Sequence, residues 1–169
     1  RERNMGLKAL DTAEMKLENL EIGREFLLGG DRGCNFARLM NYSRVALAAM
    51  AVGVARASYD YAREYAKQRI AFGEPIAQRQ AIAFMLADMA IELDSTRCLV
   101  WEAAWKLDSG QLALRESYLA KLYADQMVTQ VCDCGVQTLG GHGYIREHPV
   151  ELWFRNARGF SAFEGMAIV

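Results

Sequence analysis

Hydrophobic side chains recur every three or four positions along most of the chain, which is the period of an α-helix with one buried face. The first such face contains Met40, Ser43, Leu47, Met50, Val54, Ala57 and Tyr61. It begins just after Asn35, a residue type that caps helix N-termini, and runs to Lys67. The pattern predicts a helix of about 33 residues, roughly 50 Å long, that ends before the glycine and proline of FGEP at 72–75.

Two more long helices and one short helix follow in the same pattern. The second face contains Ile82, Leu86, Met89, Leu93, Thr96, Val100, Ala103 and Leu107, and it ends at the DSG of 108–110. The third contains Tyr118, Leu122, Thr129, Cys132, Val136 and Leu139, and it stops at the GGHG of 140–143. Pro149 then opens the short helix VELWFRNAR, at a position where its missing N–H costs nothing. Together the helices predict an antiparallel four-helix bundle.

The segment before the helices has a different pattern. Residues 15–22, MKLENLEI, alternate well enough to predict a half-buried strand with a slip at Asn19. A strand pair does not fold alone, so residues 1–30 are expected to form the edge of a sheet, followed by a flexible junction, GGDRG, at 29–33. The predicted fold is therefore mainly α, a four-helix bundle over 34–169 preceded by a short β segment within 1–33.

Composition and charge exclude several functions. The 169 residues carry a net charge of −1, so no overall field draws the chain to nucleic acid. The longest apolar run, at 45–55, is too short to span a membrane. Because the helix is apolar around most of its circumference at 45–57, we expect contacts between subunits. The spread of the four cysteines, Cys34, Cys98, Cys132 and Cys134, favours reduced thiols in a reducing compartment. The spacing of Cys132 and Cys134, taken with His142 and His148, fits no common zinc site.

Three short stretches could carry chemistry. In SAFEG, 161–165, apolar neighbours would raise the pKa of Glu164, and Gly165 would let a ligand approach; the alternative is a solvated carboxylate. In RIAFG, 69–73, a cation and an aromatic ring precede a turn and are a candidate site. The alternative is a solvated Arg and a core Phe. In QTLGGHGY, 137–144, glycine N–H groups could bind a phosphate. The alternative is that the glycines only end a helix.

In their order along the chain, these motifs resemble a known family. RIAFG, Gln80, QTLGGHGYIREHPVELWFRNAR and FEG resemble the C-terminal helical domain of the acyl-CoA dehydrogenases, and MGLKALDT at 5–12 is similar to the end of that family's middle β-domain. The resemblance implies that 1–33 end the middle domain, that 34–169 form the C-terminal bundle, and that the full-length protein is a dimer of dimers. An electron-accepting flavoprotein is implied as its partner.

The resemblance also implies roles for individual residues. Glu164 becomes the base that removes the α-proton of an acyl-CoA while hydride leaves to FAD, because Ser43 stands where another branch of the family carries its base. The implied FAD contacts, made to a neighbouring subunit, are Arg69, Phe72, Gln80, Gln137, Gly140 and Gly141. Asn41 and Arg44 are the implied contacts with coenzyme A, and Gly165 leaves room for the acyl chain.

Four positions depart from the family pattern, and the first is Asn41, where the family commonly has Asp. Met166 and Ile168 replace polar residues, and Asn156 replaces the usual Asp. A non-catalytic assembly module and an oxidase that passes electrons to oxygen are therefore the alternative functions. The chain begins at Arg1, so we expect the N-terminal part of the flavin site to be missing and this chain alone to be inactive. The expected location is the bacterial cytoplasm or, alternatively, the mitochondrial matrix.

Overall fold

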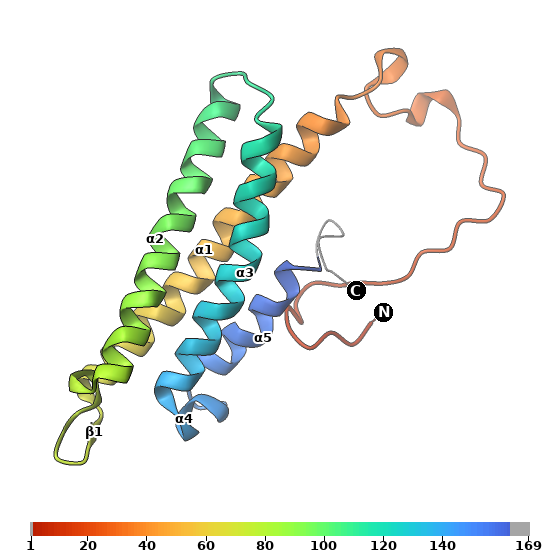
Figure 1. Ribbon diagram of the computed structural model, residues 1–169. Helices are drawn as coiled ribbons and strands as arrows, with labels where there is room; N and C mark the ends of the chain where they lie inside the picture. Colours follow the sequence, from red (N-terminus) through yellow and green to blue (C-terminus); the bar gives the residue numbers. More distant parts are fainter. Residues whose placement is uncertain (1, 163–169) are drawn as a thin grey trace.

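The computed structural model describes residues 2–162 and is mainly helical (Figure 1). The long helices are α1 (Phe36–Gln68), α2 (Gln80–Asp108) and α3 (Leu114–Leu139), and the shorter ones are α4 (Gly141–Tyr144) and α5 (Val150–Phe160). Short 3-10 turns occupy Arg24–Phe26, Gly30–Arg32 and Ile76–Gln78. Within the described range, no helix is both long enough and apolar enough to cross a membrane. The mainly α class predicted from the sequence is confirmed.

Helix α3 is the central element of the packing. It lies against α1, α2 and α5, and α1 also contacts α2 and α5 (Figure 1). Its buried residues recur every three or four positions and form one broad face of the helix: Ser117, Ala120, Lys121, Ala124, Asp125, Met127, Val128, Val131, Cys132, Gly135, Thr138 and Leu139. The core is therefore built around α3, and it includes two charged side chains.

The helix ends lie where local sequence signals predicted them. The side chain of Asn35 accepts a hydrogen bond from the Arg38 N–H at 3.0 Å and caps α1. Gly110, after α2, and Gly140, after α3, have φ angles of 80° and 58°, in the left-handed region that favours glycine. The glycines after Gly140 do not simply end the helix, because Gly141–Tyr144 form the additional turn α4.

The predicted buried face of the first helix is wrong by one position. The residues of α1 that are buried are Asn41, Ala48, Ala51, Ala55, Ser58, Ala62 and Ala66. Met50, which was expected in the core, is 61% exposed. Small side chains let α1 approach its neighbours closely, and its larger apolar residues lie beside this contact or at the surface. The face predicted for α2 is largely correct, with Met89, Leu93, Thr96, Val100, Ala103 and Leu107 buried.

The strand predicted over 15–22 is also wrong. In the described part of the chain this segment has no strand partner, and Met15, Leu17, Leu20 and Ile22 are each 60% or more exposed. A strand needs a neighbour to bond its backbone, but segment 2–35, after its first residues contact α5, arches away from the helices before it joins α1 (Figure 1). The strands found within 2–162 are β1 (Ile70–Ala71) and β2 (Glu74–Pro75), an antiparallel hairpin between α1 and α2.

Candidate functional site

A surface cavity of about 350 Å³ lies where α1 and α3 end side by side. Its lining includes Tyr65 and Arg69 from the end of α1, and Gln137, Gly140, Gly141 and His142 from the end of α3 and from α4. Four of the residues predicted to bind a cofactor therefore share one cavity, although 68 positions separate Arg69 from Gln137.

The backbone around this cavity is held in place on both sides. The N–H of Arg69 donates to the Tyr65 carbonyl at 2.8 Å, and the Arg69 carbonyl accepts from the Ile76 N–H at 2.9 Å. On the opposite side, the Gly140 carbonyl accepts from the Gly143 N–H at 2.9 Å. A Cβ added at Gly140 or Gly141 would meet nothing within 4 Å, so these glycines border open space. The arrangement presents a cation, an amide and an uncovered glycine backbone to a ligand.

Two neighbouring tyrosine–histidine pairs were not predicted from the sequence, and one of them, Tyr65 with His142, lines the cavity. The Tyr65 hydroxyl lies 2.8 Å from His142 Nδ1, and the Tyr61 hydroxyl lies 2.8 Å from His148 Nδ1. The two imidazole rings stack with centroids 5.3 Å apart. The tyrosines share one face of α1, but the turn of α4 that brings the histidines to them could not be read from spacing. Among residues 2–162, no three His, Cys, Asp or Glu side chains gather as metal ligands would.

The other two predicted cofactor residues lie outside the cavity lining. Phe72 is at the tip of the β1–β2 hairpin, 95% exposed, with a φ of 55°. The Arg79 guanidinium lies 5.6 Å from the centre of its ring and donates to its carbonyl at 3.4 Å. Gln80 is exposed at the first position of α2. Both residues therefore lie exposed at the surface of the described chain.

The predicted contacts with coenzyme A lie near the opposite end of α1, roughly 40 Å from Arg69 along the helix. Asn41 is fully buried, and its side-chain amide donates to the Leu112 carbonyl at 2.7 Å, which ties α1 to the α2–α3 loop. Arg44 donates to Asn41 Oδ1 at 3.3 Å and lies 5.7 Å from the centre of the Tyr118 ring. Asn41 therefore has a structural role, and its contact with a substrate stays a prediction.

Glu164 and Gly165 lie outside the described residues, which end at Ala162. Ala162 itself lines a second cavity, of about 380 Å³, between α5 and the N-terminal segment. On one side of it, the Arg155 guanidinium donates to the Met5 carbonyl at 3.0 Å and to Glu151 at 2.8 Å. Arg155 also holds the pKa of the Glu151 carboxyl below its ordinary value. The last described residue, Ala162, therefore lies beside a cavity.

A buried ion pair adjoins this region and was missed from the sequence. Lys121 in α3 is 0% exposed, and its ammonium donates to Asp125 Oδ2 at 2.6 Å and to the Phe160 carbonyl at 3.0 Å. Lysine is almost never fully buried without a partner, so the position is unusual. The only available signal was the spacing of four residues, which is more typical of pairs on a helix surface.

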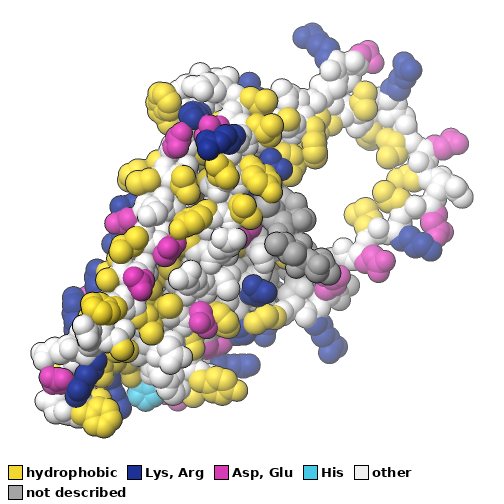
Figure 2. Space-filling model, viewed as in Figure 1, with side chains coloured by type: hydrophobic (Ala, Val, Ile, Leu, Met, Phe, Trp, Pro, Cys, Tyr) yellow, Lys and Arg dark blue, Asp and Glu magenta, His cyan; other side chains and the backbone are white. Residues whose placement is uncertain are grey.

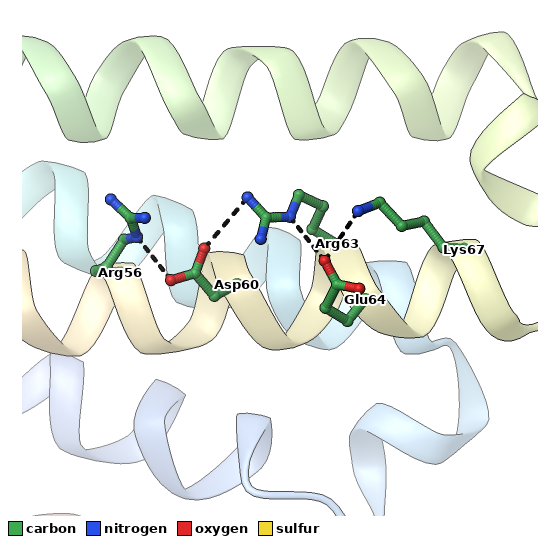
Figure 3. Close-up of polar contacts among 5 residues, drawn as sticks. All are labelled: Arg56, Asp60, Arg63, Glu64 and Lys67. Carbon is green, nitrogen blue, oxygen red and sulfur yellow. Dashed lines mark hydrogen bonds and ion pairs between the residues drawn. The ribbon is translucent and has the colours of Figure 1, made fainter.

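On α1, a row of charged residues with similar spacing forms ion pairs at the surface of the helix (Figure 3). Arg56 bonds to Asp60 at 2.6 Å, Arg63 lies between Asp60 and Glu64, and Lys67 bonds to Glu64 at 2.9 Å. Lys67 and Arg63 hold the pKa of the Glu64 carboxyl below its ordinary value. Each side chain is 37% or more exposed, so this row is a solvated ion-pair network.

Comparison with known proteins gives one consistent result. The family model described as the acyl-CoA dehydrogenase C-terminal domain matches residues 32–167. Subunit CarC of the caffeyl-CoA reductase-Etf complex of Acetobacterium woodii is 38% identical over 99% of this chain and 45% of its own length. The mitochondrial short-chain specific acyl-CoA dehydrogenase of Rattus norvegicus is 39% identical over 98% of this chain and 40% of its own length.

Solved structures show the same similarity. Butyryl-CoA dehydrogenase from Megasphaera elsdenii superimposes with a TM-score of 0.76 and 35% identity, over 80% of this chain and 36% of that one. A chain from the structure of the electron transferring flavoprotein of Acidaminococcus fermentans gives a TM-score of 0.88 and 34% identity, over 96% of this chain and 43% of that one. The chain thus spans less than half the length of these relatives.

Proposed function

The chain belongs to the acyl-CoA dehydrogenase family, and from this premise we propose that it is the C-terminal domain of an enzyme that dehydrogenates acyl-CoA thioesters with FAD. In this proposal, residues 1–33 end the preceding domain, and α1, α2, α3 and α5 form its four-helix bundle. The cavity at the ends of α1 and α3 carries the proposal, because it gathers Arg69, Gln137, Gly140 and Gly141 from distant parts of the sequence.

The residues of this cavity suit the diphosphate of a dinucleotide. The planar guanidinium of Arg69 can bind two phosphate oxygens, and the Gln137 amide can donate to a third. The Gly140 N–H already donates to the Gln137 carbonyl at 3.1 Å, so in this proposal the Gly141 N–H, whose backbone no side chain covers, meets the anion. We place Phe72 and Gln80 on the same FAD molecule, which a neighbouring subunit binds. When bound, FAD supplies the acceptor for the hydride from the β-carbon of the substrate.

The proposed base is Glu164. Its carboxylate takes the α-proton of the thioester, and backbone N–H groups stabilise the negative charge that develops on the thioester oxygen. Two residues before it, the exposed Ala162 lines the cavity between α5 and the N-terminal segment, and this cavity is the observation that supports the assignment. In this proposal Gly165 leaves space for the acyl chain, and Asn41 and Arg44 lie toward coenzyme A.

The names of two relatives favour a second direction for the same chemistry. Besides CarC, the 3-(aryl)acrylate reductase of Clostridium sporogenes is 36% identical over 99% of this chain. In a dehydrogenase, Glu164 would remove the α-proton of a saturated thioester. In a reductase of this kind, Glu164 would deliver the α-proton to an unsaturated thioester. The two directions use the same residues, so the substrate that turns over decides between them.

We also propose that the complete protein is a homo-oligomer, arranged as a dimer of dimers, that exchanges electrons with a flavoprotein. The surface of α2 supports subunit contacts, since Phe84, Ile91, Trp101 and Trp105 are each 59% or more exposed. Figure 2 shows hydrophobic side chains at the surface over this helix. Exposed apolar surface of this kind commonly marks an interface. The named Etf complex of CarC supports the electron-transfer partner.

The test is the substitution Glu164→Gln in the complete protein loaded with FAD. Because glutamine cannot take up the proton, we expect kcat for saturated acyl-CoA oxidation to fall by about 10³-fold or more while flavin absorbance is kept. Ordinary desaturation by this variant would contradict the assignment of the base. A colourless protein that cannot be reconstituted with FAD would favour the assembly module, and release of hydrogen peroxide during turnover would reveal an oxidase.

A further inference from the structure

The buried lysine of α3 holds the end of α5. Lys121 Nζ donates to the Phe160 carbonyl at 3.0 Å while Asp125 anchors the same ammonium at 2.6 Å. Phe160 is the last residue of α5, and its side chain is 2% exposed within the core. Both its backbone and its ring are therefore fixed against the central helix.

The end of a helix is a suitable place for this contact. The last carbonyls of an α-helix have no partner within the helix, and a cation there also meets the negative end of the helix dipole. The next residues continue the turn, with the Ala162 N–H donating to the Gly159 carbonyl at 3.1 Å. Lys121 thus fixes the point from which the chain enters the segment of Glu164.

We propose that Lys121 is a positioning residue for Glu164. The inference rests on the proposed function, and Lys121 acts through the backbone without touching the substrate. Glu164 is four residues beyond Phe160, so its Cα lies within about 14 Å of that anchor even in a fully extended chain. A base must be held to within about an ångström to act efficiently. The anchor limits where the carboxylate can reach.

Stability alone does not account for a charge pair at this position. Moving an ammonium and a carboxylate out of water is costly, and apolar side chains of similar size often stabilise a core equally well or better. Such side chains would fill the space between α3 and α5, but they could not bond to the Phe160 carbonyl. What the pair of Lys121 and Asp125 adds is a directional contact to the end of α5.

The experiment replaces both charges, Lys121→Met with Asp125→Leu, in the complete FAD-loaded protein, so that no unpaired charge stays buried. A matched control, Lys106→Met with Glu116→Leu, removes an ion pair of 2.7 Å that joins α2 to α3 without contacting α5. Steady-state oxidation of butyryl-CoA and a longer acyl-CoA by an artificial electron acceptor gives kcat and KM. Amide hydrogen exchange over 158–169 reports how firmly the segment is held.

We expect the double variant to lose about 10- to 100-fold in kcat, with KM changed by less than about threefold and flavin absorbance kept. Exchange over 158–169 should become faster in this variant and stay unchanged in the control, whose kcat should remain within about twofold. A merely structural role would instead lower the amount of folded, flavin-loaded protein without changing kcat per flavin. A variant that holds flavin with unchanged kcat would overturn the inference.

A milder variant covers the case in which the double variant does not fold. Asp125→Asn keeps a hydrogen-bonding group beside Lys121 but removes the charge that anchors it. We expect a kcat loss of about threefold or more with faster exchange over 158–169, and no change in either would overturn the inference. If the unaltered protein oxidises no acyl-CoA, the proposed function fails by itself. Hydrogen exchange still reports whether Lys121 holds the segment.

Discussion

Asn156 on α5 accepts a hydrogen bond of 2.7 Å from the backbone N–H of Leu7, 149 positions earlier in the chain. Around this bond the N-terminal segment fits closely onto the helix. Leu7 has a φ of 50°, and a Cβ added at Gly6 would lie 2.1 Å from the Arg155 carbonyl oxygen. Asn156 is a departure from the family's usual Asp, but both side chains carry an oxygen that can accept this bond.

Replacing Asn156 by Leu is expected to lower the free energy of unfolding by about 1–3 kcal/mol, because the half-buried Leu7 N–H loses its partner. Asn156→Asp keeps the acceptor and is the matched control, with an expected change below about 1 kcal/mol. Urea denaturation measures both values, and hydrogen exchange at the Leu7 amide should become faster only in the leucine variant. Equal stability of the two variants would contradict the role of this bond.

Two helix glycines should respond in opposite ways to substitution by alanine. At Gly135 in α3, an added Cβ would lie 2.2 Å from Ser58 Oγ in the contact with α1, so we expect a loss of about 1–3 kcal/mol. At Gly53 in α1, a Cβ would meet nothing within 4 Å, and alanine should stabilise the helix by about 0.5–1 kcal/mol.

Thermal unfolding measures both changes, and a double variant identifies the cause of the first. Ser58→Ala removes the oxygen that an alanine at position 135 would meet, so combining the two substitutions should restore most of the lost stability. If the double variant is as unstable as Gly135→Ala alone, the clash with Ser58 is not the reason for the loss.

The helix ends were predictable because their signals are local. Asn35 caps α1 through a bond to a residue three positions away, and Gly110 and Gly140 adopt backbone angles that other residues avoid. The buried face of α1 was not predictable in this way. Residues 45–57 are apolar on most sides, so the period alone does not select a face. Close packing of small side chains such as Ala48 and Ala51 selects it, and that depends on α3.

The candidate site was partly predictable for a similar reason. Arg69 and Gly140 end their helices by local rules, and only the packing of α1 against α3 brings the two ends together. The burial of Lys121 was not predictable, because the spacing of a charged pair does not show whether the pair is buried. Arg56 and Asp60 also lie four apart with a 2.6 Å contact, yet they are 49% and 38% exposed, whereas Lys121 is 0% exposed. The two pairs have the same spacing and opposite charges, but one lies at the surface and the other lies in the core.

The cysteines should differ in reactivity according to burial. Burial raises the pKa of the Cys132 thiol to about 12, whereas Cys34 and Cys98 are exposed. Since the thiolate is the reactive form, iodoacetamide at pH 8 should label Cys34 and Cys98 and leave Cys132 unlabelled until the protein unfolds. Mass spectrometry of peptides from native and urea-treated protein measures this. Labelling of native Cys132 at the rate of Cys98 would contradict its burial.

The same raised pKa gives a dependence of stability on pH. The folded state keeps the Cys132 proton up to a higher pH than the unfolded state, whose thiol has a pKa near 9. Its contribution to stability is therefore complete below about pH 9 and is lost as the pH rises from there toward 12. Cys132→Ala should show a smaller fall in the free energy of unfolding over this range than the unaltered protein, as measured by urea denaturation.

The last prediction uses the two tyrosine–histidine pairs as a matched comparison. Tyr65 and its partner His142 line the proposed FAD cavity, whereas Tyr61 and His148 do not line it, although the bond is 2.8 Å in both pairs. Tyr65→Phe removes the hydroxyl that orients His142, so we expect FAD to bind about 3- to 10-fold more weakly in the complete protein. Tyr61→Phe should leave the Kd within about twofold of the unaltered value. Quenching of flavin fluorescence on titrating the apoprotein gives both constants. Equal losses in the two variants would mean that the pairs stabilise the helix ends in general and that the cavity does not hold the flavin.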